Sequence, residues 1–157
     1  MIKPPLIVTM GDPSGIGPEI VVKTLYEGNA GTCVVAGSSA VMRDAVLALG
    51  FDLKIEKLTE IEQATGRKGC IEVLETGGDG PFPVGKVSPA SGHAAFDAIV
   101  AGIKLAKDGR AAGMVTAPIH KEALSAAGLK FPGHTEMLAE FGGADRVAMM
   151  LANEDVR

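Results

Sequence analysis

The sequence predicts an α/β fold in which a mainly parallel sheet carries helices on both faces. Strand and helix signals alternate along nearly all 157 residues, as they do in chains of β-α-β units. Hydrophobic residues make up 46% of the chain and aromatic residues only 4%, so aliphatic side chains must build the core, as a buried parallel sheet requires. A glycine-rich turn between the first strand and the first helix is the third observation. We expect residues 1–157 to form one α/β portion with a sizeable core.

Caps and breakers define the elements of the first half. Pro18 stands where a first helical residue tolerates a missing N–H, and Gly28 stops that helix. Ser38 or Ser39 caps the second helix, which Gly50 ends. The elements predicted here are a strand over 6–8, a helix over 18–27, a strand over 32–37, a helix reaching residue 49, a half-exposed strand over 51–58 and a strand over 70–74.

The second half is divided in the same way. Gly and Pro fill most of 77–85, which predicts a surface loop. Ser91 is predicted to cap the clearest helix, which has one apolar face and ends at Gly109. The elements that follow are a strand over 113–116, a helix over 121–127, a helix from Thr135 and Glu136 to residue 141 and a strand over 146–152. No closing helix follows this last strand, so the pattern looks unfinished.

Composition narrows the class of protein. A net charge of −4 argues against nonspecific binding of nucleic acid, which needs a concentrated basic surface. The sequence has no secretory signal pattern and no apolar run of membrane length, so we expect a cytoplasmic protein without a membrane partner. Cys33 and Cys70 lie in apolar strand-like runs, which favours buried thiols over a disulfide or a metal pair.

The turn after the first strand is the most informative segment. It places backbone N–H groups at the carboxyl end of a strand, where α/β proteins bind ligands. Gly11, Gly15 and Gly17 do not have the spacing of a dinucleotide fingerprint, and no lysine follows as in a P-loop. Asp12 would repel a phosphate unless it serves a substrate hydroxyl or a metal. Many α/β loops are rich in glycine for turn geometry alone, so both interpretations stay open.

Three strand-to-loop junctions carry polar residues, and we expect them to meet at one edge of the sheet. They span residues 11–15, 116–121 and 132–136. His134 follows a Pro-Gly turn at a helix start and is a better ligand candidate than His93, which we interpret as a surface or packing residue. Thr135 could instead cap its helix, and Lys121 could bind an anion or be a solvated charge. No cluster has the spacing of a complete metal site.

Together the junctions resemble the 4-hydroxythreonine-4-phosphate dehydrogenase family of pyridoxal phosphate biosynthesis. The matching motifs are MGDPSGIGPE at 10–19, TAPIHKEAL at 116–124 and FPGHTE at 131–136, with further matches at 85–87, 91–95 and 147–151. The resemblance covers essentially the whole chain. It implies a two-domain fold similar to that of the isocitrate and isopropylmalate dehydrogenases, working as a homodimer.

The resemblance also implies a reaction. The family oxidises 4-phosphooxy-L-threonine at its secondary alcohol with NAD (or NADP), giving a β-keto acid that loses CO₂. A divalent metal such as Zn, Mg or Co, held by three histidines, polarises the alcohol oxygen as a Lewis acid. Carried onto this chain, the Gly-His-Thr motif assigns substrate binding to His134 and Thr135, and Gly11, Asp12 and Lys121 are expected to line the cleft.

Length is the departure from the family. Its members are about twice as long, and their metal-binding histidines lie beyond the segment that matches. We therefore expect no metal ligand within residues 1–157, and we expect this N-terminal half to be inactive alone. Two alternatives remain. Close relatives oxidise 4-phospho-D-threonate, 4-phospho-D-erythronate or dihydrodiol dicarboxylates, and a protein of another class would be a non-catalytic α/β ligand-binding module.

Overall fold

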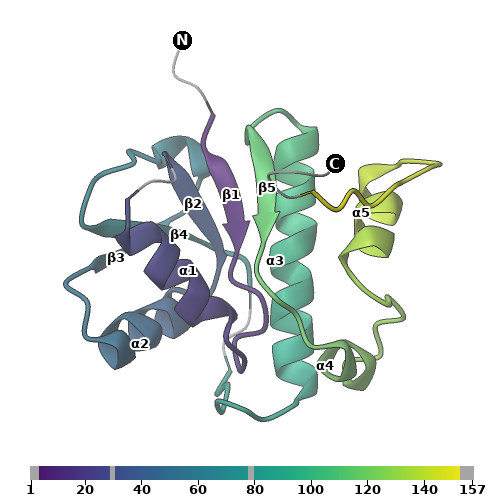
Figure 1. Ribbon diagram of the computed structural model, residues 1–157, viewed down its shortest axis with the longest axis horizontal. Helices are drawn as coiled ribbons and strands as arrows, with labels where there is room; N and C mark the ends of the chain where they lie inside the picture. Colours follow the sequence, from purple (N-terminus) through teal and green to yellow (C-terminus); the bar gives the residue numbers. More distant parts are fainter. Residues whose placement is uncertain (1–3, 29–30, 78–79, 153–157) are drawn as a thin grey trace.

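A five-stranded parallel sheet organises the chain (Figure 1), and its strand order is β3-β4-β2-β1-β5. The computed structural model describes residues 4–28, 31–77 and 80–152. The strands are β1 (Leu6–Thr9), β2 (Cys33–Gly37), β3 (Lys54–Leu58), β4 (Cys70–Glu75) and β5 (Gly113–Thr116). The helices are α1 (Gly17–Tyr26), α2 (Ser39–Leu49), α3 (Pro89–Lys107), α4 (Lys121–Ala126) and α5 (His134–Gly142), with a 3-10 turn over Ile61–Gln63.

The central strand β1 decides the topology. Its residue Ile7 pairs with Val34 of β2 on one side and with Met114 of β5 on the other, and both pairings are parallel. The chain enters β1 first, adds β2, β3 and β4 on one side, and then crosses through α3 to place β5 on the other side. The loops that follow β1 and β5 therefore leave neighbouring strands in opposite directions, which creates the crevice where open α/β sheets bind ligands.

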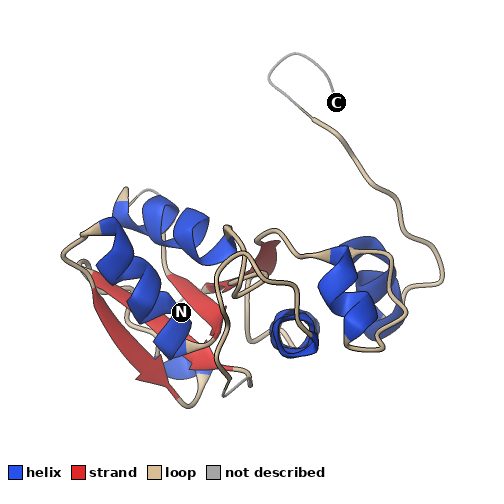
Figure 2. Ribbon diagram, turned by 90° about the horizontal axis from the view of Figure 1, so that it is seen from below, coloured by secondary structure: helices blue, strands red, loops and turns tan. Residues whose placement is uncertain are grey.

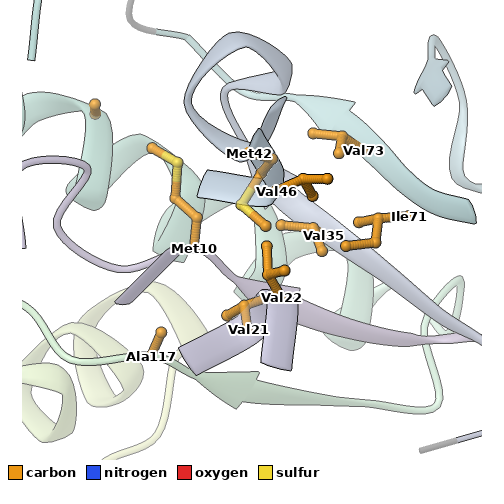
Figure 3. Close-up of a cluster of buried hydrophobic side chains, with 10 residues drawn as sticks. Met10, Val21, Val22, Val35, Met42, Val46, Ile71, Val73 and Ala117 are labelled. Carbon is orange, nitrogen blue, oxygen red and sulfur yellow. The ribbon is translucent and has the colours of Figure 1, made fainter. Parts of the chain in front are cut away.

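The two faces of the sheet carry separate cores, because alternate residues of a strand point to opposite faces. Val35 of β2 packs with Val22 of α1 and Met42 of α2 in the core shown in Figure 3. Its neighbours Val34 and Ala36 pack instead against the α3 face, with Ala98. The expected α/β fold, with a parallel sheet and helices on both faces, is confirmed.

The last two helices pack mainly on α3. Ile99 and Ile103 of α3 share a core with Leu124 of α4 and Met137 of α5. Three phenylalanine rings extend this core, with centroids 5.5–5.8 Å apart: Phe96, Phe131 and Phe141. In Figure 2, α3 is seen end-on between the sheet and these two helices. α3 is therefore covered on both sides.

One predicted helix cap is wrong, and a second possible cap does not form. Ser88, not Ser91, caps α3: its Oγ accepts the N–H of Ser91 at 3.1 Å, because Pro89 takes the first helical position. Ser91 is fully buried in the first turn. Thr135 does not cap α5 either, because the helix already begins at His134 and its N-cap position is held by Gly133.

The cap of α2 resolves the open choice between two serines. The Oγ of Ser38 accepts the N–H of Val41, so Ser38 is the cap. The hydroxyl of Ser39 donates to Glu75 at 2.7 Å and links the helix to the end of β4.

Two predicted strands also need correction. The strand expected over 51–58 begins only at Lys54, since the N–H of Phe51 donates to Val46 and closes the end of α2. The segment 146–152 is not a strand in the structure. A strand requires hydrogen bonds to a neighbour, whereas this segment leaves the helices without pairing to a described strand (Figure 2). Its side chains Met149, Met150 and Leu151 are 73–81% exposed.

The structure also tests the predicted surface loop over 77–85. Gly77 and residues 80–85 lie outside helices and strands, as the loop prediction requires, and residues 78–79 lie outside the described residues.

Cys33 and Cys70 are half-buried and form no disulfide with each other. Burial raises the pKa of both thiols. They are less buried than the sequence predicts, because each stands at the first position of its strand.

The contact between α3 and α4 depends on Gly92. A Cβ at this position would lie 2.1 Å from the carbonyl oxygen of Ala123, which is backbone and cannot rotate away. We expect Gly92→Ala to lower the free energy of unfolding by roughly 2 kcal/mol, measured by urea denaturation. Gly142→Ala is the matched control, because a Cβ there meets nothing within 4 Å, and it should be neutral or slightly stabilising. Equal stability of both variants would contradict this close packing.

Candidate functional site

The turn between β1 and α1 is held by its own side chain and backbone. Asp12 is buried, and its Oδ1 accepts the N–H of Ser14 at 2.8 Å. Its carbonyl oxygen accepts the N–H of Gly15 at 3.0 Å. This is the Asx-type turn for which aspartate is well suited. At least one carboxylate oxygen of Asp12 therefore has a structural role.

The first two junctions predicted from the sequence meet directly. The N–H of Asp12 donates to the carbonyl oxygen of Pro118 at 2.9 Å, which joins the loop after β1 to the loop after β5. Gly11 has a φ of 74°, and a Cβ there would lie 2.3 Å from the same oxygen. Only glycine fits this position without strain. The contact lies at the carboxyl edge of the sheet, where the loops after β1 and β5 meet.

Two buried hydroxyls flank this turn, and the sequence analysis did not single them out. Thr9 Oγ1 and Ser14 Oγ are buried and have no hydrogen-bond partner among the described residues. Buried polar groups are usually paired, so two unpaired hydroxyls at the end of β1 mark a polar place in an otherwise aliphatic core. In the sequence, only their closeness to the glycine-rich turn could have indicated them: Thr9 precedes Gly11, and Ser14 precedes Gly15.

Lys121 lies beyond the loop that follows β5. It is the first residue of α4, the helix that follows the β5 loop, and it is exposed. Among the described residues its ammonium group makes no ion pair. It can therefore meet an anion without first breaking a salt bridge.

His134 begins α5 and is half-buried, as is Thr135 beside it. The Nε2 atom of His134 is covered and has no hydrogen-bond partner among the described residues. Burial lowers the pKa of this imidazole, so the ring is neutral near pH 7. An unpaired buried nitrogen costs free energy of about 1–3 kcal/mol, which a group that supplies a partner would recover.

The third junction does not join the first two. Within the described part of the chain no hydrogen bond links residues 132–136 to Gly11, Asp12 or Pro118, and α5 packs on the far side of α3 (Figures 1 and 2). The expected meeting of three junctions therefore holds for two. The reason is the length of the connection after β5, which first forms α4 and then returns along α3.

His93 is exposed on α3, in keeping with its interpretation as a surface residue. One turn further on, Asp97 is half-buried, and burial raises the pKa of its carboxyl group, opposed by the charge of His93. Across the described residues there is no group of three or more His, Cys, Asp or Glu side chains that could hold a metal ion. The described residues do not fit a metal site, and we derive no chemical step through a metal.

The buried imidazole makes stability depend on pH. Because the pKa of His134 is lower in the folded chain than its ordinary value of about 6.5, the unfolded chain binds more protons as the pH falls. We expect the free energy of unfolding to decrease between about pH 7.5 and about pH 5.5. In urea denaturation at several pH values, His134→Gln should flatten this part of the profile. The exposed-site variant His93→Gln should keep it, and an unchanged profile in His134→Gln would contradict the assignment.

Comparison with known proteins shows which family the sequence resembles. Residues 29–157 match the family described as pyridoxal phosphate biosynthetic protein PdxA. The chain is 51% identical to a 4-hydroxythreonine-4-phosphate dehydrogenase of Beijerinckia indica subsp. indica, covering 100% of the chain and 47% of that protein. It is 39% identical to a D-threonate 4-phosphate dehydrogenase of Cupriavidus necator, covering 98% of the chain and 47% of that protein.

Solved structures of the same family have a similar fold. The crystal structure of a 4-hydroxythreonine-4-phosphate dehydrogenase from Burkholderia phymatum superposes with a TM-score of 0.91 at 36% identity, over 98% of this chain and 48% of that one. A terephthalate 1,2-cis-dihydrodiol dehydrogenase from Burkholderia xenovorans, at 24% identity and a TM-score of 0.69, shares the fold. No described helix has both the length and the low polarity of a membrane span.

The chain spans about half the length of the curated relatives it matches. The family match nevertheless covers most of its residues, and it includes the loop after β5 and the start of α5. The chain belongs to the pyridoxal phosphate biosynthetic protein PdxA family.

Proposed function

We propose that this chain is the N-terminal part of an enzyme that oxidises 4-phosphooxy-L-threonine with NAD and a divalent metal, with decarboxylation, in pyridoxal phosphate biosynthesis. The observation that carries the proposal is the 51% identity, over the whole chain, to a protein named for this dehydrogenase. The contact of Gly11 and Asp12 with Pro118 supports it, because it lies at the carboxyl ends of neighbouring strands, where open α/β sheets bind small molecules.

His134 and Thr135 are the proposed substrate-binding pair. A neutral imidazole can donate one hydrogen bond and accept another, and the covered Nε2 of His134 has no partner among the described residues. A phosphate or carboxylate oxygen of the substrate would accept a hydrogen bond from this ring. The hydroxyl of Thr135, in the first turn of α5, would donate to the same anion near the positive end of the helix.

Gly11, Asp12 and Lys121 are proposed to line the cleft. Asp12 keeps the turn closed through Ser14, and Lys121 offers the substrate a positive charge at the rim. The metal, when bound, supplies a Lewis acid for the alcohol oxygen, with ligands expected outside residues 1–157. We further propose a homodimer in the cytoplasm, with no nucleic-acid or membrane partner, in keeping with the net charge of −4.

The second candidate is a D-threonate 4-phosphate dehydrogenase. It is favoured by relatives such as the Cupriavidus necator protein, which carries that name at 39% identity. Both substrates end in a phosphate and a carboxylate, and they differ in an amino group against a hydroxyl. An enzyme that distinguishes the two substrates needs a side chain that forms a hydrogen bond with the amino group or with the hydroxyl, but not with both.

A chimera tests the proposed function. This chain would replace the matching half of the Beijerinckia indica relative, and NADH absorbance would be followed with each substrate and a divalent metal. We expect NADH from 4-phosphooxy-L-threonine and little from 4-phospho-D-threonate. The 157-residue chain alone should give none. A chimera that melts cooperatively, retains its metal and yet forms no NADH would favour the non-catalytic binding module instead.

A further inference from the structure

The two edge strands of the sheet differ in charge. β3 lies at one end of the described sheet and β5 at the other. Charged side chains occupy three of the five positions of β3: Lys54, Glu56 and Lys57. β5 carries no charged residue and no proline. Because charges on an edge strand discourage pairing with a further strand, β3 is protected against such pairing and β5 is not.

The backbone of β5 is open on its outer side. Within the described part of the chain, β1 is the strand that pairs with it. The N–H of Ala117, directly after β5, donates to the carbonyl oxygen of Thr9 at 3.3 Å. Backbone groups alternate in direction along a strand, so Val115 also faces β1, while Met114 and Thr116 turn their N–H and C=O groups away from the sheet. Such outward groups are a template for an added strand.

One face of β5 is also uncovered. Val115 pairs with Val8, so both side chains point to the face of the sheet that carries α1 and α2. Val8 packs against the core of that face, whereas Val115 is 51% exposed. The described helix that packs on β5 is α3, which covers the opposite face (Figure 1). An apolar side chain in the middle of a strand is therefore left without a covering layer.

More apolar side chains are exposed after α5. Met149, Met150 and Leu151 belong to the segment that pairs with no described strand. Exposed apolar surface of this kind marks sites of interaction with other polypeptide. The chain covers 47% of the Beijerinckia indica relative and 48% of the Burkholderia phymatum structure. An enzyme of the proposed kind thus has about as much polypeptide again to cover these side chains.

We propose that β5 is the docking surface for the C-terminal half of the enzyme, which adds a strand along its outer side and buries Val115. This inference rests on the proposed function, because that function places the metal ligands outside residues 1–157. It explains the difference in charge: β3 remains an edge in the complete enzyme, whereas β5 becomes an interior strand. Docking here also brings the second half next to the loop after β5, which contacts Asp12 at the carboxyl edge of the sheet.

Hydrogen exchange in the chimera with the Beijerinckia indica half tests the added strand without any substitution. By NMR, the amide protons of Met114 and Thr116 should exchange at least about 100-fold more slowly than those of an unstructured peptide. Ile55 and Lys57 are the internal control, because the N–H of Lys54 donates to Gly69 and the next amides along β3 face outward. The control amides should exchange fast. Equally fast exchange at Met114 and Thr116 would overturn the proposal.

A charge on the uncovered face tests the burial of Val115. In the chimera, Val115→Lys should speed exchange at Met114 and Thr116 at least about tenfold, because the second half would have to bury an ammonium group. Leu47→Lys is the control, since Leu47 is 71% exposed on α2, and it should leave this exchange unchanged. Unchanged exchange in a folded Val115→Lys chimera would contradict the burial.

The identity of the partner is tested by cross-linking. Val115→Cys, labelled with a photoreactive group in the chimera, should cross-link to residues of the second half. Cross-links to β5 of another copy would show edge-to-edge pairing of two chains and overturn the assigned partner. Protected β5 amides in a chimera that forms no NADH would support the docking surface and reject the proposed function. NADH formation with unprotected β5 amides would overturn the docking surface alone.

Discussion

Gly11→Ala is expected to lower the free energy of unfolding by about 3 kcal/mol or more. Two penalties add at this position. A φ of 74° is costly for a residue with a Cβ, by roughly 1–2 kcal/mol. The new Cβ would also lie 2.3 Å from the carbonyl oxygen of Pro118, and relieving this overlap must move one of the two loops and stretch the hydrogen bond from Asp12.

Gly50→Ala separates the two penalties. Gly50 has nearly the same φ, 68°, but a Cβ there meets nothing within 4 Å. Gly50→Ala should lower the free energy of unfolding by only about 1–2 kcal/mol, the cost of the backbone conformation alone. Urea denaturation of both variants measures the difference. If Gly11→Ala is no more destabilising than Gly50→Ala, the loops after β1 and β5 are not in the contact described.

His134→Ala is expected to reduce kcat/KM for 4-phosphooxy-L-threonine roughly 10- to 100-fold, the equivalent of one hydrogen bond to a charged group. The assay uses the chimera with the Beijerinckia indica half, and most of the loss should appear as a higher KM, because the proposed role is substrate binding. Metal content should stay near that of the parent protein.

His93→Ala is the control for this experiment, since His93 is exposed on α3. It should change neither kcat/KM nor metal content. Loss of bound metal in His134→Ala would instead identify His134 as a metal ligand and overturn its assignment as a substrate-binding residue.

The strands of the sheet were predictable because each has a local sequence signal. Apolar runs such as Leu6-Ile7-Val8, closed by glycine turns, predict buried parallel strands without knowledge of their partners. Strand order was not predictable in this way. It depends on which side of β1 the chain takes after α3, and no local signal encodes that choice.

Helix caps show how neighbouring signals compete. Ser88 and Ser91 both precede apolar helical residues, and only the position of Pro89 decides between them. At α5 the helix begins at His134, one residue before Thr135, so Gly133 takes the N-cap position. The segment 146–152 has the composition of a strand, but composition cannot supply a hydrogen-bonding partner.

For the site, the sequence predicted that the junctions would meet at the carboxyl edge of the sheet, and the first two do so because β1 and β5 lie side by side. It could not place His134, whose position depends on packing of α5 against α3. Thr9 and Ser14 were missed because a hydroxyl without a partner is a property of three-dimensional packing.

The most direct test of the account is an NMR titration of the histidine ring protons in the chimera with 4-phosphooxy-L-threonine. If His134 binds the substrate, its ring resonances should shift with saturation and those of His93 should not move. Turnover of the substrate with the His134 resonances unchanged would contradict the proposed site.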